Sequence, residues 1–262
     1  MSAAANGGAA GLVFPEPALL VRGPEVVART TAAALTVENL RAAYRRGIFP
    51  WPSGPRAMIP WCCPRVRAVL VFAELTPGRT LEKAARKGGW SFSINRAFPE
   101  VIAACAAAAR PEQEGTWIAP AVVAAYTALH HAGAAHSVEV WRDGELVGGL
   151  YGVDAGGAFG GESMFHRVDN ASKLALLHLA AHLQARGSTW IDIQQLTPHL
   201  ERLGAREVLR EDFLAQLSGE LAVGRVLFPS GETGCGAAEN YPHGPDAGAL
   251  LFRGAPGRIV GT

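Results

Sequence analysis

Long apolar runs and a strong net charge of either sign are both missing from this sequence of 262 residues. The formal net charge is +1, so no long-range electrostatic field draws the chain toward nucleic acid or a membrane surface. No stretch reaches the roughly eighteen uninterrupted apolar residues of a membrane-spanning helix, and no basic segment followed by an apolar one indicates a signal peptide. We therefore expect a cytoplasmic protein that does not bind a membrane.

Motifs for metals, nucleotides and covalent catalysis are missing as well. There is no G-x-x-x-x-G-K-[ST] loop, and Ser163 lacks the G-x-S-x-G context of a nucleophile elbow. His178 and His182 stand one helical turn apart without a third ligand, a pattern more typical of core or surface histidines than of zinc. The cysteines have no zinc spacing, and their use fits a reducing compartment. They are Cys62, Cys63, Cys105 and Cys235.

Glycine, in contrast, is especially dense in residues 148–170. Two apolar runs, residues 146–153 and 158–165, flank the tetrapeptide Asp154-Ala155-Gly156-Gly157, which predicts a β-hairpin. Such a density of glycine indicates a backbone that another group approaches closely. Glu162 lies in the second run, where a carboxylate is costly unless it is paired. A solvent-facing Glu162 on an edge strand fits the sequence equally well.

A second strand, predicted over residues 190–196, places Asp192 and Gln194 on the same face, because side chains alternate along a strand. With Glu162, these residues give one carboxamide and two carboxylates in an apolar setting. Such a group suits positioning and proton transfer rather than a covalent intermediate or a cofactor. The residues alone therefore indicate an α/β enzyme of one or two domains.

Helices are predicted where a capping residue precedes an apolar period. Thr36 caps a helix over residues 37–46, and Asn170 is the expected N-cap of a long helix that ends near residue 186. A third helix, over residues 80–87, has the densest basic cluster of the sequence. This cluster is either a solvated helix face or a set of phosphate contacts. Its members are Arg79, Lys83, Arg86 and Lys87.

Trp51 and Trp61 lie in a proline-rich segment, which predicts an ordered loop rather than a helix or a central strand. Packing in the core explains both rings. Aromatic rings on such loops also form stacking platforms for bases, so both interpretations stay open.

Seven short segments give a more specific signal: AYRRGIFPW at residues 43–51, EGTWI at 114–118, HSVEVW at 136–141, ELVGGLYGV at 145–153, GESMF at 161–165, NASK at 170–173 and IDIQ at 191–194. In order and spacing they resemble the leucyl/phenylalanyl-tRNA–protein transferases, over roughly residues 14–230. The resemblance implies an enzyme that moves Leu, Phe or Met from aminoacyl-tRNA to proteins with an N-terminal Arg or Lys. The new peptide bond marks these proteins for N-degron degradation. The enzyme would be a monomer and would need no metal or cofactor.

The same resemblance implies an α/β (α+β) fold, with a small N-terminal domain and a C-terminal domain like the GCN5-related acetyltransferases. We expect the N-terminal domain to comprise residues 14–66 and the catalytic domain to comprise residues 67–230. Residues 1–13 are expected to be disordered, and residues 231–262 are expected to form a flexible tail.

The resemblance also assigns roles to single residues. Trp51 and Trp117 would hold the 3′-terminal adenosine of the tRNA. Glu162, Asp192 and Gln194 would form the catalytic group, with Asp192 orienting Gln194. The basic helix defined above would contact the tRNA. Six apolar residues would line the pocket for the aminoacyl side chain: Leu150, Phe159, Met164, Leu176, Leu179 and Ile191.

Two other classes of function fit the sequence less well. An N-acyltransferase that uses acetyl-CoA would need an R/Q-x-x-G-x-G/A loop at a helix N-terminus, and no segment has this pattern. A non-catalytic tRNA-binding module would have no need of Glu162, Asp192 and Gln194 together.

Overall fold

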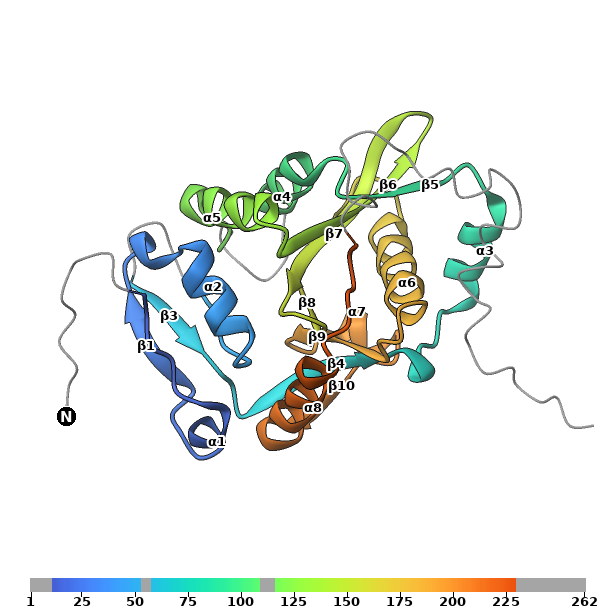
Figure 1. Ribbon diagram of the computed structural model, residues 1–262. Coiled ribbons are helices and arrows are strands. Elements are labelled where there is room, and N and C mark those ends of the chain that lie inside the picture. The colour runs from blue at the N-terminus through green and yellow to red at the C-terminus, as the bar shows by residue number, and fades with distance from the viewer. Residues whose placement is uncertain (1–10, 53–57, 109–115, 230–262) are drawn as a thin grey trace, which may run out of the picture.

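The computed structural model describes residues 11–52, 58–108 and 116–229 (Figure 1). They form two β-sheets with helices around them, which confirms the predicted α/β class with a small N-terminal part and a larger C-terminal part. The likeness to GCN5-related acetyltransferases stays a prediction. The small sheet has the strand order β1-β3-β2. Its strands are β1 (Val26–Thr30), β2 (Phe49–Pro50) and β3 (Ile59–Cys62).

The middle strand of the small sheet contains Pro60, so the prediction of a loop at this proline is wrong. A proline is tolerated in a strand at a position where no N–H is needed for a hydrogen bond to a neighbouring strand. Here the backbone of Pro60 takes part through its carbonyl, which accepts a hydrogen bond from the N–H of Trp51 at 2.8 Å.

The large sheet has seven strands in the order β10-β4-β9-β8-β7-β6-β5. Its neighbouring strands are antiparallel except β8 and β9, which are parallel and pair at Gly160 and Asp192 in the described chain. Beyond this pair the two strands separate, and the candidate site lies there. The strands are β4 (Val66–Val71), β5 (Ser91–Ile94), β6 (Ala135–Arg142), β7 (Glu145–Asp154), β8 (Phe159–His166), β9 (Trp190–Gln194) and β10 (Arg206–Leu209).

Strands β7 and β8 form the predicted glycine-rich hairpin. Gly156 and Gly157 in its turn have φ values of 100° and 115°, which side chains rarely allow. The Asp154 carboxylate fixes the turn by accepting the N–H groups of both glycines at 2.7 and 2.8 Å. Because β8 has β7 on one side and β9 on the other, Glu162 does not lie on an edge strand, and that alternative is wrong.

Helix α6 (Ala171–Gln184) packs directly on β7, and glycine makes this possible. A Cβ atom at Gly148 would lie 2.5 Å from the Cβ of Ala171, so any side chain there would push the helix away. Asn170 is the N-cap residue of this helix, as predicted, but its side chain does not cap the backbone. Asn170 has a φ of 70°, and its side chain accepts a hydrogen bond from Lys173 instead of capping the backbone.

Helix α2 (Val37–Tyr44) lies between the two sheets in Figure 1. Its predicted cap is confirmed, because Thr36 Oγ1 accepts the N–H of Asn39 at 3.2 Å. The basic helix is α3 (Arg79–Lys87), which packs on α6. The other helices are α1 (Pro17–Leu20), α4 (Phe98–Ala107), α5 (Pro120–His131), α7 (Pro198–Glu201) and α8 (Arg210–Val223), with short 3₁₀ turns at Ala32–Ala34 and Phe72–Glu74.

The apolar residues form two clusters, which take alternate side chains of the large sheet. Leu150 belongs to one cluster and Tyr151 to the other, as expected for neighbours on a strand. His178 and His182 on α6 are buried, His178 stacked on Phe92 and His182 hydrogen-bonded to the carbonyl of Leu227. Burial lowers the pKa of His178 to about 3. The interpretation of these two residues as core histidines is confirmed.

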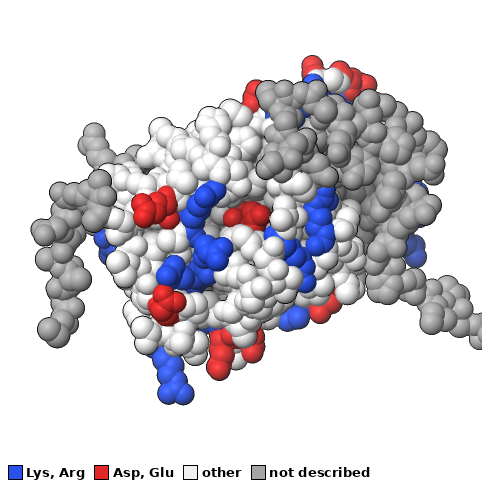
Figure 2. Space-filling model, viewed as in Figure 1, with Lys and Arg blue, Asp and Glu red and all other residues white. Residues whose placement is uncertain are grey.

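The surface that Figure 2 shows has acidic and basic side chains interspersed, in keeping with the net charge of +1. Within the described part of the chain, no helix is long and apolar enough to cross a membrane. The domain boundary between residues 66 and 67 stays a prediction. The predicted disordered start and flexible tail lie outside the described residues, except for residues 11–13.

Candidate active site

A pocket of about 290 Å³ opens where β8 and β9 separate. Its walls come from both sheets: residues 49–51 extend from β2, while the opposite wall is built by β7, β8, β9 and α6. Trp117, just before α5, and Thr197, His199 and Leu200, around the start of α7, also line the pocket. The pocket therefore depends on how the small sheet lies against the large one.

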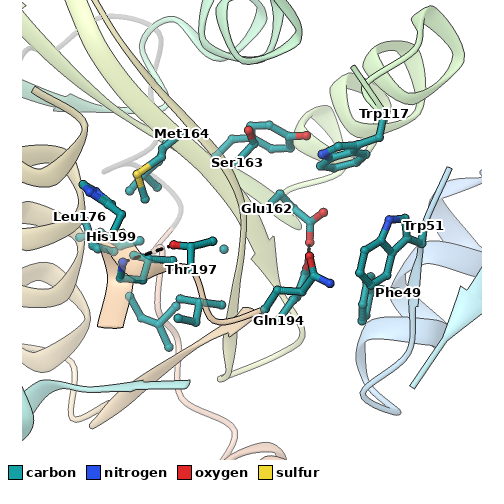
Figure 3. A pocket seen from close by; sticks show the side chains of 18 of the residues that line it. Phe49, Trp51, Trp117, Glu162, Ser163, Met164, Leu176, Gln194, Thr197 and His199 are labelled. Atoms are coloured by element: carbon teal, nitrogen blue, oxygen red, sulfur yellow. Dashed lines mark hydrogen bonds between the residues drawn. The ribbon is translucent and has the colours of Figure 1, made fainter. Parts of the chain in front are cut away.

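The pocket has an aromatic end and an aliphatic end. Figure 3 shows Trp51, Trp117 and Phe49 on one side and Met164 and Leu176 on the other. Further apolar residues line the pocket: Leu150, Leu179, Ile191, Ile193 and Leu200. A flat aromatic group and an aliphatic side chain could therefore occupy the two ends at the same time.

Two polar side chains, Glu162 and Gln194, lie between these ends (Figure 3). The Nε2 group of Gln194 donates a short hydrogen bond to Oε1 of Glu162. Each comes from one of the two separating strands, Glu162 from β8 and Gln194 from the last position of β9. Gln194 has a φ of 63°, so the strand ends there and its side chain departs from the regular alternation.

Two buried tyrosines support Glu162 from behind. The hydroxyl of Tyr44 on α2 donates to Oε1 at 2.7 Å, and that of Tyr126 on α5 donates to Oε2 at 3.4 Å. The two hydroxyl oxygens are themselves 2.6 Å apart. Burial raises the pKa of Glu162 to about 7, although the hydrogen bonds from Tyr44 and Gln194 oppose this shift. The carboxyl group can therefore gain or lose a proton near neutral pH.

Asp192 lies beside the pocket rather than in its lining. Both of its oxygens accept hydrogen bonds from Arg67, and Oδ1 also accepts the backbone N–H of Gln194 at 2.9 Å. Asp192 thus contacts the backbone of Gln194, whereas the carboxamide itself contacts Glu162, and the orienting role of Asp192 stays a prediction. Arg67 is buried between the rings of Phe49 and Phe213, each centred 4.5 Å from the guanidinium carbon.

The structure brings most of the predicted site residues together. Trp51 and Trp117, Glu162 and Gln194, and five of the six apolar residues line one pocket. The exception is Phe159, which is buried at the hairpin end of β8, 5.5 Å from the ring of Phe228. Trp61 is fully buried and donates to Thr30, so core packing is the correct interpretation for that ring.

The four basic residues Arg79, Lys83, Arg86 and Lys87 do not line this pocket, and all four are exposed on α3. The contact of this helix with tRNA stays a prediction. In the described part of the chain, no three His, Cys, Asp or Glu residues are grouped so that they could hold a metal ion.

Sequence reasoning missed three residues of the site. Tyr44 and Tyr126, whose hydroxyl groups reach Glu162, were not among the predicted site residues. Arg67 on β4 was not among them either. An arginine at an otherwise apolar strand position was a signal for a buried partner, because an unpaired buried charge is very unfavourable.

Comparison with known proteins identifies relatives along most of the chain. The family model "Leucyl/phenylalanyl-tRNA protein transferase" matches residues 69–218, and the model of its N-terminal domain matches residues 33–65. A protein of Chromohalobacter salexigens is 47% identical over 245 residues, which cover 93% of this chain and 94% of the relative. One from Nitrosomonas europaea is 50% identical over 184 residues, covering 70% and 77%, and one from Pectobacterium atrosepticum is 45% identical over 207 residues, covering 79% and 86%. All three relatives are named leucyl/phenylalanyl-tRNA–protein transferase.

Proposed function

The chain belongs to the leucyl/phenylalanyl-tRNA protein transferase family, and on that premise we propose that it transfers Leu, Phe or Met from aminoacyl-tRNA to proteins with an N-terminal Arg or Lys. The modified proteins would be marked for N-degron degradation. One observation supports this proposal most: a single pocket has an aromatic end, an aliphatic end and a polar pair between them. An aminoacyl-adenosine has the same three parts, namely a base, an apolar side chain and a reactive ester.

The adenine base is assigned to Trp51 and Trp117. Stacking of a base on an aromatic side chain contributes about 1–3 kcal/mol, and it tolerates any base because every base has a flat face. The aminoacyl side chain is assigned to the aliphatic end, around Met164, Leu176 and Leu179. The ester carbonyl would then lie near Glu162 and Gln194.

The donor ester is already activated, so no nucleotide is consumed. The acceptor is an N-terminal amine with an ordinary pKa of about 7.7–8.0, and it must be neutral to attack. The new bond joins the amine nitrogen to the ester carbonyl carbon. The bond from that carbon to the ribose oxygen breaks, and the proton of the amine ends on the departing oxygen.

In this reaction Gln194 would orient the amine. An amide is too weak a base to remove its proton, but the carbonyl oxygen of Gln194 can accept a hydrogen bond from it. The Nε2 group already donates to Glu162, which supports this use of the remaining oxygen. Asp192 would act as a positioning residue through the backbone of Gln194.

Glu162 has two possible roles in this proposal. It is the one carboxylate among the described residues that line the pocket, so it could attract the cationic end of the acceptor. It could instead bind the ribose of the donor. Glu162→Gln separates the two roles: a higher KM for an Arg-initiated peptide supports the first, and a higher KM for the donor supports the second.

The function is tested by supplying Leu-tRNA with a labelled leucine and two peptides that differ at the first residue, Arg or Ala. We expect label on the Arg peptide and at least ten-fold less on the Ala peptide. Acetyl-CoA with a labelled acetyl group, in place of Leu-tRNA, is the control donor. It is expected to label neither peptide. Equal labelling of the two peptides would contradict the acceptor rule, and labelling only from acetyl-CoA would contradict the donor.

A further inference from the structure

A second groove lies next to the active-site pocket, and the two share His199. Its volume is about 480 Å³. One wall is the start of α3, at Gly78 and Thr80, and the other consists of Asn170 and Lys173 at the start of α6. Arg202, just after α7, completes it. The groove therefore leads from the pocket to the basic helix α3.

The groove has a positive lining. Lys173 and Arg202 supply its positive charge, and among the described residues that line it there is no Asp or Glu. Burial lowers the pKa of His199, and the positive charges of Lys173 and Arg202 lower it further, which agrees with their facing the same space. Because the charged side chains that line this groove are all positive, the groove is suited to binding an anion.

We propose that this groove binds the phosphodiester backbone of the single-stranded 3′ end of the donor tRNA, adjacent to its terminal adenosine. The proposal rests on the function proposed above. The active-site pocket has room for the terminal aminoacyl-nucleoside, so the preceding nucleotides must leave it along the protein surface. A polynucleotide backbone binds where cationic side chains replace its counterions.

The other substrate fits the groove poorly. An acceptor with an N-terminal Arg or Lys has at least two positive charges, which Lys173 and Arg202 would repel. The pyrophosphate of a coenzyme A molecule also has negative charge that would suit the groove. The experiment below distinguishes this ligand from a polynucleotide.

The experiment uses the full chain with the double substitution Lys173→Ala and Arg202→Ala. Three leucylated donors are compared: tRNA, a trinucleotide that ends in adenosine, and adenosine alone. In the variant, KM should rise about ten-fold for the tRNA and the trinucleotide. The rise in KM for leucyl-adenosine, which has no phosphodiester, should be at least five-fold smaller. The salt dependence of trinucleotide binding should become less steep, because each lost phosphate contact removes up to about 0.7 from the logarithmic slope.

Two further variants make the result specific. The first is a triple substitution on α3, Lys83→Ala with Arg86→Ala and Lys87→Ala. It should weaken binding of the tRNA but not of the trinucleotide, which is too short to extend along that helix. The second, Arg22→Ala with Arg29→Ala, removes as much positive charge as the groove variant, but from exposed positions near the small sheet. It should leave KM for all three donors unchanged. Lys173→Arg with Arg202→Lys keeps the charge and should retain most of the affinity.

Three outcomes would overturn the groove assignment. The first is an equal rise in KM for all three donors in the groove variant. The second is a rise in KM of the same size in the Arg22 and Arg29 variant. The third is displacement of the trinucleotide by coenzyme A at a similar concentration. Binding of the trinucleotide without an attached leucine, measured by fluorescence anisotropy, does not require the transfer reaction. A wild-type chain that binds it but transfers no leucine would therefore contradict the proposed function while supporting the groove.

Discussion

The guanidinium of Arg67 and the carboxylate of Asp192 form a buried two-point ion pair, with Nε–Oδ1 and Nη2–Oδ2 distances of 2.8 and 2.7 Å. Their side chains are 2% and 10% exposed. Arg67 also donates to the carbonyl of Gly47 at 3.2 Å, and Asp192 accepts the backbone N–H of Gln194. One chain of hydrogen bonds therefore joins the end of α2 to the residue that we assign to orienting the amine.

Arg67→Met is expected to destabilise the protein by about 3–5 kcal/mol, because it leaves the carboxylate of Asp192 buried without its partner. Denaturant unfolding measures this change. The matched control is Arg206→Met, which breaks an ion pair with Glu74 whose side chains are 50% and 45% exposed. Such a pair contributes about 0–1 kcal/mol. Equal losses in the two variants would show that the Arg67 pair has no special role.

Gln194→Ala is expected to lower kcat by about 100-fold, the effect of losing the group that orients the attacking amine, and to leave KM for Leu-tRNA nearly unchanged. Gln194→Glu should not restore the rate, since it would put a second carboxyl group against Glu162. Gln184→Ala, at the exposed end of α6, is the control. A near-normal kcat in a folded Gln194→Ala protein would mean that the orienting role is wrong.

Trp51→Ala should raise KM for the donor by the loss of one stacking contact, about 1–3 kcal/mol, or roughly 5- to 150-fold. Trp51→Phe keeps an aromatic face and should recover most of this loss. Trp141→Ala, on β6 outside the pocket lining, tests whether removing any partly exposed tryptophan has the same effect. Steady-state kinetics with leucyl-adenosine isolates the contact from the rest of the tRNA.

Glu162→Gln should change how stability depends on pH. The pKa of Glu162 is about 7 in the folded chain and about 4.5 when unfolded, so the folded state holds the proton more strongly. Stability from this group is complete below pH 4.5 and is lost as the pH rises through 7, by at most about 3 kcal/mol. Between pH 4.5 and 8, the wild type should therefore lose more stability than Glu162→Gln. Parallel pH curves of the free energy of unfolding would contradict this assignment.

The aliphatic end should prefer Leu, Met and Phe to Ile and Val. Met164, Leu176 and Leu179 are flexible, and they can adapt to side chains of different length. A methyl group on Cβ widens the side chain next to the ester, which in the proposed function lies near Glu162 and Gln194. Apolar pockets discriminate by about 1–3 kcal/mol per methyl-sized difference, so some transfer of Ile is expected. Equal rates for leucyl- and isoleucyl-adenosine would rule out this selectivity.

Local features of the fold could be predicted from the sequence because their causes are local. The hairpin of β7 and β8 follows from two apolar runs around Gly156 and Gly157, and the start of α2 follows from Thr36. At Asn170 the N-cap position could be predicted from the sequence, but the φ of 70° and the missing side-chain cap could not, because Asn at this position usually caps with its side chain.

The site shows where local reasoning ends. Glu162, Asp192 and Gln194 stand out as polar residues in apolar strands. The partner of Asp192, however, is Arg67, which lies 125 positions earlier in the chain. Tyr44 and Tyr126 reach Glu162 only because two helices from distant segments meet there. Such pairings depend on the packing of whole elements, and no short pattern in the sequence encodes them.

The pocket's walls come from both sheets, and this joint construction has a consequence for how the enzyme would fail under stress. Phe49 and Trp51 come from the small sheet, and Tyr44 from the helix beside it, whereas Gln194 ends a strand of the large one. A partial opening that moves only the N-terminal part away would remove one wall and the hydrogen bond from Tyr44 to Glu162 while the seven strands stay paired. In a denaturant titration, activity would then disappear before the backbone amides of β6 and β7 lose their protection from hydrogen exchange.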